Sequence, residues 1–93
     1  MEPELIHVGF GNFIAANRVV AIVSPGSAPI QRKVREGKKK GVIVDTTQGR
    51  RTKAVVFMDD GSVMLAPISP EAIVGRVAAH LSPGGRLARA QDD

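Results

Sequence analysis

Apolar residues in this chain fall into short runs, which are separated by connections rich in glycine and charge. Residues 42–66 hold three such runs. The last two runs meet at Asp59, Asp60 and Gly61, a sequence typical of a tight turn between antiparallel strands. The pattern therefore predicts three short strands here, and it predicts further extended segments at residues 5–8, 13–16 and 19–23.

Two segments carry helix signals at both ends or along one face. Ser27 is a candidate N-cap, Pro29 fits the first turn, and Gly41 is a typical stop, so a helix is predicted over Ala28–Lys40. A second helix is predicted to start at Pro70 after the cap residue Ser69. Its apolar face would comprise Ile73, Val74, Val77, Ala78 and Leu81.

The order of these elements predicts an α+β fold, with a small, antiparallel-rich sheet of five to six short strands and two helices. Residues 1–81 form the predicted domain, and residues 82–93 are predicted to be a disordered tail. Gly37, inside the first helix, is expected to let its last turn fray.

Three of the predicted strands are apolar without alternation: residues 19–23, 42–44 and 54–58. Continuous apolar runs are typical of strands that are covered on both faces of a sheet. Two helices can cover about one face. The pattern therefore predicts that a second copy of the chain covers the remainder, unless a tightly curled sheet covers its own second face.

Charge is distributed unevenly along the 93 residues, which carry a net charge of +4. The segment from Arg32 to Lys53 holds nine basic and two acidic residues, whereas the rest of the chain holds four basic and seven acidic ones. A single charged run is usually a solvated face. Here a basic helix is followed by a second basic cluster on a loop, and this combination favours an anionic partner.

Composition also narrows the classes of function. The chain has no cysteine and no cluster of His, Asp or Glu at metal-ligand spacing, so neither a disulfide nor a metal or other cofactor is predicted. His7 and His80 are the only candidate bases for five serines, and neither lies in a nucleophile motif, so no enzyme is predicted. No signal peptide or membrane span is recognised, and a soluble, cytoplasmic protein is expected.

The clearest candidate site is residues 48–52, which we call the arginine loop. It contains Gly49 followed by Arg50 and Arg51. Successive side chains on an extended or turning backbone diverge, so at least one of the two guanidinium groups must point outward. The loop therefore predicts a fixed cationic feature between two strands.

Three strings carry a resemblance to a known family: GFGN at residues 9–12, NRVVAIVSPGSAPIQR at 17–32, and VDTTQGRRTKAVV at 44–56. Together they make the chain similar to the RemA family of bacterial DNA-binding regulators, in register from about residue 5 to residue 76. This resemblance implies a protomer like the LytTR type of DNA-binding domain. It also implies a ring-shaped homo-oligomer of seven or eight subunits.

The resemblance further implies that the protein binds double-stranded DNA and regulates transcription. It implies neither a small-molecule substrate nor a membrane partner. Arg50 and Arg51 match family positions that contact DNA. Arg18 lies in a matched string and is expected to contact either DNA or a neighbouring subunit. Lys53 stands where the family usually has Arg, and Gln31 where it usually has Lys. The remaining predicted DNA-binding residues are Lys53, Arg32 and Lys33.

Two alternatives use the same basic face. An RNA or single-strand binder would need aromatic side chains on which bases stack, and the chain has only Phe10, Phe13 and Phe57. A protein-interaction module would instead direct the basic face at an acidic partner protein. Steep salt dependence and competition by heparin would distinguish DNA binding from that second alternative.

Overall fold

A computed structural model of the chain describes residues 4–81. The elements follow in the order β1 (Leu5–Gly9), β2 (Asn12–Ala15), the 3-10 turn η1 (Ala16–Arg18), β3 (Val19–Val23), α1 (Ala28–Lys40), β4 (Ile43–Asp45), β5 (Ala54–Met58), β6 (Val63–Ala66) and α2 (Pro70–Leu81). This confirms the α+β class. The tail predicted at residues 82–93 lies outside the described residues.

The strands form two sheets, where the sequence pattern predicted one. β1 and β2 pair as a hairpin, and the other four strands form a sheet in the order β3-β5-β6-β4. The β5–β6 hairpin is confirmed. β4, however, pairs in parallel with β6, so the two strands that flank the arginine loop are not neighbours.

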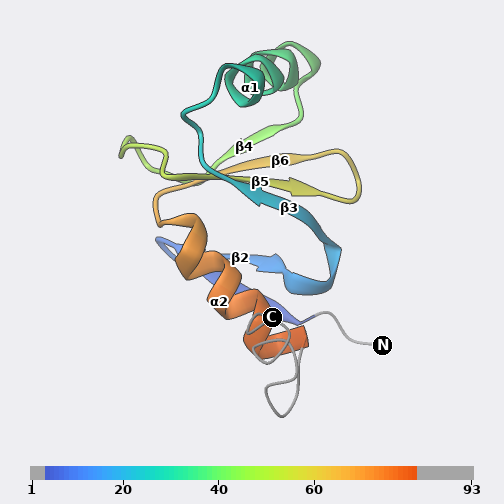
Figure 1. Cartoon of the computed structure of the whole chain (residues 1–93), viewed down its shortest axis with the longest axis vertical. Helices are drawn as coiled ribbons and strands as arrows, with labels where there is room; N and C mark the ends of the chain where they lie inside the picture. Colours follow the sequence, from blue (N-terminus) through green and yellow to red (C-terminus); the bar gives the residue numbers. More distant parts are fainter. Residues whose placement is uncertain (1–3, 82–93) are drawn as a thin grey trace.

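The four-stranded sheet lies between two layers that come from the same chain. α1 covers one face, while α2 and the β1–β2 hairpin cover the other (Figure 1). Alternate residues of β5 enter two separate cores: Val55 packs with Ile30 and Val34 of α1, and Val56 packs with Ile6 and Ile73. Two-sided burial explains why β5 is apolar without alternation.

The expected reason for a second copy is therefore wrong, because the N-terminal hairpin covers the face that two helices were thought to leave open. Exposed apolar side chains remain at the sheet edges. Val20 on β3 is 67% exposed and Val44 on β4 is 44% exposed. Each of these edge strands has a paired strand on one side only.

Both helices begin where their N-cap residues predicted. The Ser27 hydroxyl accepts a hydrogen bond from the Ile30 amide at 3.3 Å, and the Ser69 hydroxyl accepts one from the Ala72 amide at 3.1 Å. On α2, Ile73 is buried as expected, but Val74 is 40% exposed and does not belong to the core face. Neither helix is long and apolar enough to cross a membrane in the part of the chain that is described.

Gly37 has a packing role that the sequence pattern did not reveal. It is a buried residue on α1. A Cβ atom added there would lie 2.8 Å from Cδ1 of Ile43 on β4 and 3.3 Å from its Cγ1. Gly37 therefore permits the close approach of α1 to β4, and α1 remains helical through Lys40.

We expect Gly37→Ala to lower the free energy of unfolding, although alanine favours a helix, because the new methyl group displaces Ile43. Gly75→Ala is the matched control on α2, where no atom lies within 4 Å of the added Cβ. That change should stabilise the fold by about 0.5–1 kcal/mol. Urea denaturation measures both variants, and an equal gain in stability for Gly37→Ala would contradict the packing argument.

Candidate nucleic-acid interface

The connection from β4 to β5 passes over the carboxyl end of β6 and is fixed to it at both ends. The Thr46 amide and hydroxyl both donate to the Leu65 carbonyl, at 3.0 and 2.7 Å. At the far end, the Lys53 amide donates to the Ala66 carbonyl at 2.8 Å. Thr46 is buried, with 5% of its surface exposed. The arginine loop thus begins and ends at fixed points on the sheet.

Asp45 stabilises the turn into the loop. Its Oδ1 atom accepts hydrogen bonds from the Thr47 hydroxyl at 2.6 Å and the Thr47 amide at 2.9 Å. These two bonds, with a smaller contribution from the charge of Lys38, hold the pKa of the Asp45 carboxyl below its ordinary value. The Asp45 carboxylate therefore stabilises the backbone of this turn. The sequence pattern did not predict this role.

The tip of the loop has an unusual backbone that presents both arginines. Gln48 and Gly49 have φ values of 51° and 83°, and the Arg50 amide then donates to the Thr47 carbonyl at 3.0 Å. Both Arg50 and Arg51 are exposed. The prediction that at least one guanidinium points outward is confirmed.

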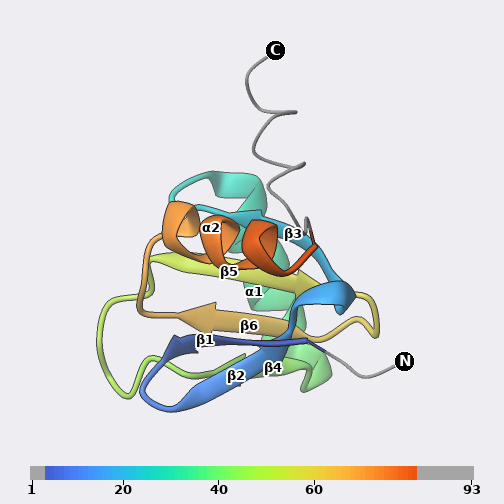
Figure 2. The ribbon, with the colours of Figure 1, turned by 90° about the horizontal axis from the view of Figure 1, so that it is seen from below.

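The arginine loop shares one hollow with the tip of the β1–β2 hairpin. Figure 1 and Figure 2 both show the loop and the hairpin tip at the same end of the molecule. The hollow has a volume of about 390 Å³, and its lining residues are Gly9, Phe10, Arg50, Arg51, Lys53, Pro67 and Ile68. Three of the six predicted binding residues are thereby brought together.

Phe10 is a residue of this site that sequence reasoning missed. Its ring lies 5.7 Å from the Cζ atom of Arg50, within the range of a cation–π contact. Phe10 is 44% exposed. The only sequence signal was an aromatic residue set between two glycines in a turn.

The basic residues of α1 lie on the face of the four-stranded sheet opposite to the β1–β2 hairpin (Figure 1). Arg32 and Lys33 are both exposed, and Lys33 lines a separate hollow with Lys40 and Phe57. Arg35 and Lys38 lie closer to the site, since they share a hollow of about 320 Å³ with Thr52 of the arginine loop. The hollow beside Thr52 is therefore lined by two cations of α1 that were not among the predicted binding residues.

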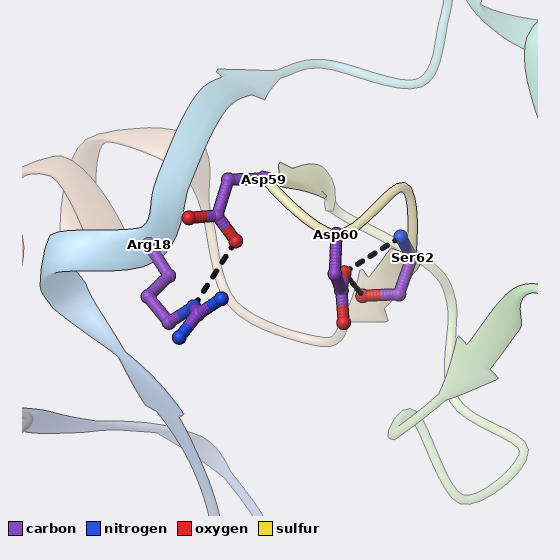
Figure 3. A network of polar contacts seen from close by, with 4 residues as sticks. All are labelled: Arg18, Asp59, Asp60 and Ser62. Carbon is purple, nitrogen blue, oxygen red and sulfur yellow. Dashed lines mark hydrogen bonds and ion pairs between the residues drawn. The ribbon is translucent and has the colours of Figure 1, made fainter.

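Arg18 lies at the opposite end of the sheet. Its Nε atom is 3.1 Å from Oδ1 of Asp59, in the turn between β5 and β6 (Figure 3). Asp60 is nearby, and its pKa is lowered by hydrogen bonds from the Ser62 hydroxyl and amide and also by the charge of Arg18. Arg18 is separated from the arginine loop by the length of β5, roughly 17 Å for five extended residues.

The described residues include no group of three His, Asp or Glu side chains placed to hold a metal ion. The lining of the hollow itself presents guanidinium and ammonium groups beside one aromatic ring. Guanidinium groups pair bidentately with phosphate and with guanine edges, and they stack on planar rings.

Comparison with known proteins gives a family for this arrangement. Residues 5–77 match the family described as "RemA-like: Extracellular matrix regulatory protein A-like". The chain belongs to the RemA-like family. The match includes β1 to β6 and most of α2, so both walls of the hollow lie inside the family region.

Relatives in this family extend over nearly the same length. A protein of Dehalococcoides mccartyi is 52% identical over 87 residues, which are 94% of this chain and 88% of that protein. A protein of Synechococcus elongatus is 54% identical over 77 residues, or 83% of this chain and 88% of the relative. One from Pelotomaculum thermopropionicum is 46% identical over 83 residues, or 89% and 91%. Their names describe candidate regulatory proteins. The chain thus belongs to a RemA-like family with bacterial members, and the names of these relatives point to regulation.

We expect Asp45→Ala to destabilise the fold by about 1 kcal/mol, because the Thr47 amide and hydroxyl lose their acceptor at a partly solvated site. Since the folded-state pKa of Asp45 is lowered, the carboxylate contributes its stabilisation above the ordinary pKa of 3.8. That contribution is lost as pH falls through the lower folded-state value. Denaturation of both proteins at pH 7 and at about pH 2.5 measures the difference, and a gap that is as large in acid as at neutral pH would contradict this role.

Proposed function

We propose that this regulator binds double-stranded DNA through the arginine loop and acts as a ring-shaped homo-oligomer. The observation that carries the proposal is the grouping of Arg50, Arg51 and Lys53 around one exposed hollow. These cations stand on a backbone fixed at Thr46 and Lys53. A protein that binds chromosomal DNA works in the bacterial cytoplasm. Its proposed activity is binding, and no catalytic step is involved.

A fixed loop suits DNA binding because little backbone freedom is lost when the complex forms. Arg50 and Arg51 can pair with phosphates, read guanine edges in the major groove, or enter a narrow minor groove. Lys53 adds a point charge without the planar fork of arginine. Arg35 and Lys38, beside Thr52, extend the positive surface from the loop towards α1.

Arg18 has surroundings that favour a protein partner over DNA. It is already paired with Asp59, and the neighbouring Asp60 adds a second carboxylate to the same turn. Phosphates approaching this region would meet negative charge from both aspartates. Of the two roles expected for Arg18, we therefore assign it contact with a neighbouring subunit.

Assembly is supported by the two edges of the four-stranded sheet. A closed ring joins one surface of each copy to a different surface of the next. β3 and β4 are the edge strands, and they expose Val20 and Val44 respectively. Repetition of the arginine loop around a ring makes further contacts intramolecular and raises avidity by roughly 10²–10⁴.

Single-stranded RNA or DNA is the second candidate, because Phe10 is exposed beside Arg50 and offers a surface on which a base can stack. Duplex DNA is favoured because the hollow is lined by three cations and by only this one aromatic ring. Competition between a duplex and a single strand of equal length separates the two candidates.

We expect Arg50→Ala and Arg51→Ala each to weaken duplex binding at least tenfold, and to reduce its logarithmic salt slope by about 1 for each phosphate that the variant no longer neutralises. Fluorescence anisotropy across a salt series measures both effects. Lys39→Ala is the control, since it removes one exposed positive charge that lines neither hollow beside the loop, and it should change affinity less. A variant at position 50 or 51 that binds as well as the wild type would contradict the assignment.

We expect duplex affinity to rise as whole helical turns are added, because identical loops meet the same face of DNA at intervals of about 10–10.5 bp. Val20→Glu and Val44→Glu should yield monomers that lose this gain, although Arg50 and Arg51 remain. Native mass spectrometry and anisotropy with duplexes of one to four turns test this. Length-independent affinity, or a monomer that binds as tightly as the wild type, would contradict assembly on DNA.

A further inference from the structure

The turn at residues 9–12 has an unusual backbone at its second position. Gly9, Phe10 and Gly11 have φ values of 114°, 54° and 75° in succession. Glycine adopts positive φ readily, but a bulky residue such as phenylalanine does so at a cost in free energy. A turn that only reversed the chain would be more stable with glycine at position 10.

Neighbouring groups hold this turn in place from several directions. The Asn12 side-chain amide donates to the carbonyls of Gly9 and Phe10, at 3.0 and 3.4 Å. The His7 Nε2 atom accepts a hydrogen bond from the Gly11 amide at 3.1 Å. A Cβ atom on Gly9 would lie 2.7 Å from Cγ of Pro67, so the turn packs directly on the segment after β6. Strained backbone of this kind persists where the surroundings determine it, and it often occurs at functional sites.

This strain places the Phe10 ring beneath Arg50. Phe10 is 44% exposed and belongs to neither core cluster, and the guanidinium carbon of Arg50 lies 5.7 Å from the centroid of its ring. A long arginine side chain on an exposed loop otherwise has many rotamers. The contact with Phe10 restricts them and directs Arg50 over the hollow shared with Arg51 and Lys53.

We propose that the turn at residues 9–12 is the second wall of the DNA interface, with Phe10 as the positioning residue for Arg50. The hollow between Phe10 and the arginine loop then receives one sugar-phosphate strand of the duplex. Its cations neutralise the phosphate, while Pro67 and Ile68 supply an apolar surface for the sugar. This inference rests on the proposed DNA binding, and it assigns a role to a residue that carries no charge.

Phe10→Gly is the most informative variant, because it should move stability and binding in opposite directions. Glycine relieves the positive φ, so the melting temperature should equal or exceed that of the wild type. Removal of the ring frees Arg50, so duplex affinity should fall by about two- to fivefold for each loop on the DNA, as expected for an exposed cation–π pair. A residue with only a structural role would lower both quantities or neither.

Two further variants distinguish the aromatic ring from apolar bulk. Phe10→Tyr retains the ring and should bind DNA like the wild type, whereas Phe10→Leu should behave like Phe10→Gly in binding. Phe13→Leu is the matched control on the same hairpin, because Phe13 is 56% exposed and packs beside His7 rather than an arginine. It should leave affinity unchanged.

A measurement without DNA tests the positioning step alone. The Phe10 ring should shift the NMR signals of the Arg50 side chain upfield, and this shift should vanish in Phe10→Leu. On DNA, Phe10→Leu should have no further effect in an Arg50→Ala background, because the two residues act through one contact.

The outcomes separate the two proposals. If the wild type binds no duplex, both are overturned. If the wild type binds, Arg50→Ala weakens binding and the Phe10 variants bind normally, the DNA interface stands and the role of Phe10 is overturned. Equal effects of Phe10→Leu with and without Arg50 would also overturn it.

Discussion

Burial of β5 on both faces is the constraint on which the rest of this structure depends. Its side chains alternate between a core beneath α1 and a core beneath α2 and the β1–β2 hairpin. A strand that packs on both faces fixes the positions of the two connections at its ends. The arginine loop leads into one end, and the Asp59–Asp60 turn leaves the other. The molecule is thereby polarised into a cationic end and an end where Arg18 is neutralised by carboxylates.

The cationic end is rigid for identifiable reasons. Thr46 and Lys53 tie the loop to β6, Asp45 fixes the turn into it, and Pro67 supports the facing hairpin tip. Arg76 of α2 donates to the His7 carbonyl, which links that hairpin to the second helix. In the proposed complex, charge on a fixed scaffold would keep its spacing against the regular array of phosphates on DNA. That property would matter more if several copies contacted the same duplex, as proposed.

Sequence reasoning succeeded where the physical signal was local. Ser27, Gly41 and Ser69 are cap residues whose hydrogen bonds involve only their own neighbourhood, so the starts of both helices and the stop of α1 at Gly41 were predicted correctly. The pairing of β4 with β6 could not be read in this way, because parallel register depends on contacts distant in sequence. The layer that covers the second face was missed for the same reason, since residues 5–15 carry no mark of where their hairpin docks.

At the candidate site, too, residues with a local sequence signal were predicted and those that depend on distant contacts were not. Arg50 and Arg51 were singled out as adjacent arginines beside a glycine and by the family resemblance, which also drew attention to Lys53, and the structure places all three around one hollow. Phe10 was missed because its importance lies in a positive φ and in a contact with Arg50, which is distant along the chain. Arg18 was grouped with the DNA-binding residues by its motif, whereas its ion pair with Asp59 places it at the far end of β5.

Hydrogen–deuterium exchange of the wild-type protein, with and without a duplex of about three helical turns, tests the central claim most directly. The account predicts that DNA slows exchange in peptides covering residues 9–12 and 46–53, while the turn at residues 59–61 exchanges as before. Protection confined to the Asp59–Asp60 end, or no protection of residues 46–53 under conditions where DNA is bound, would contradict it.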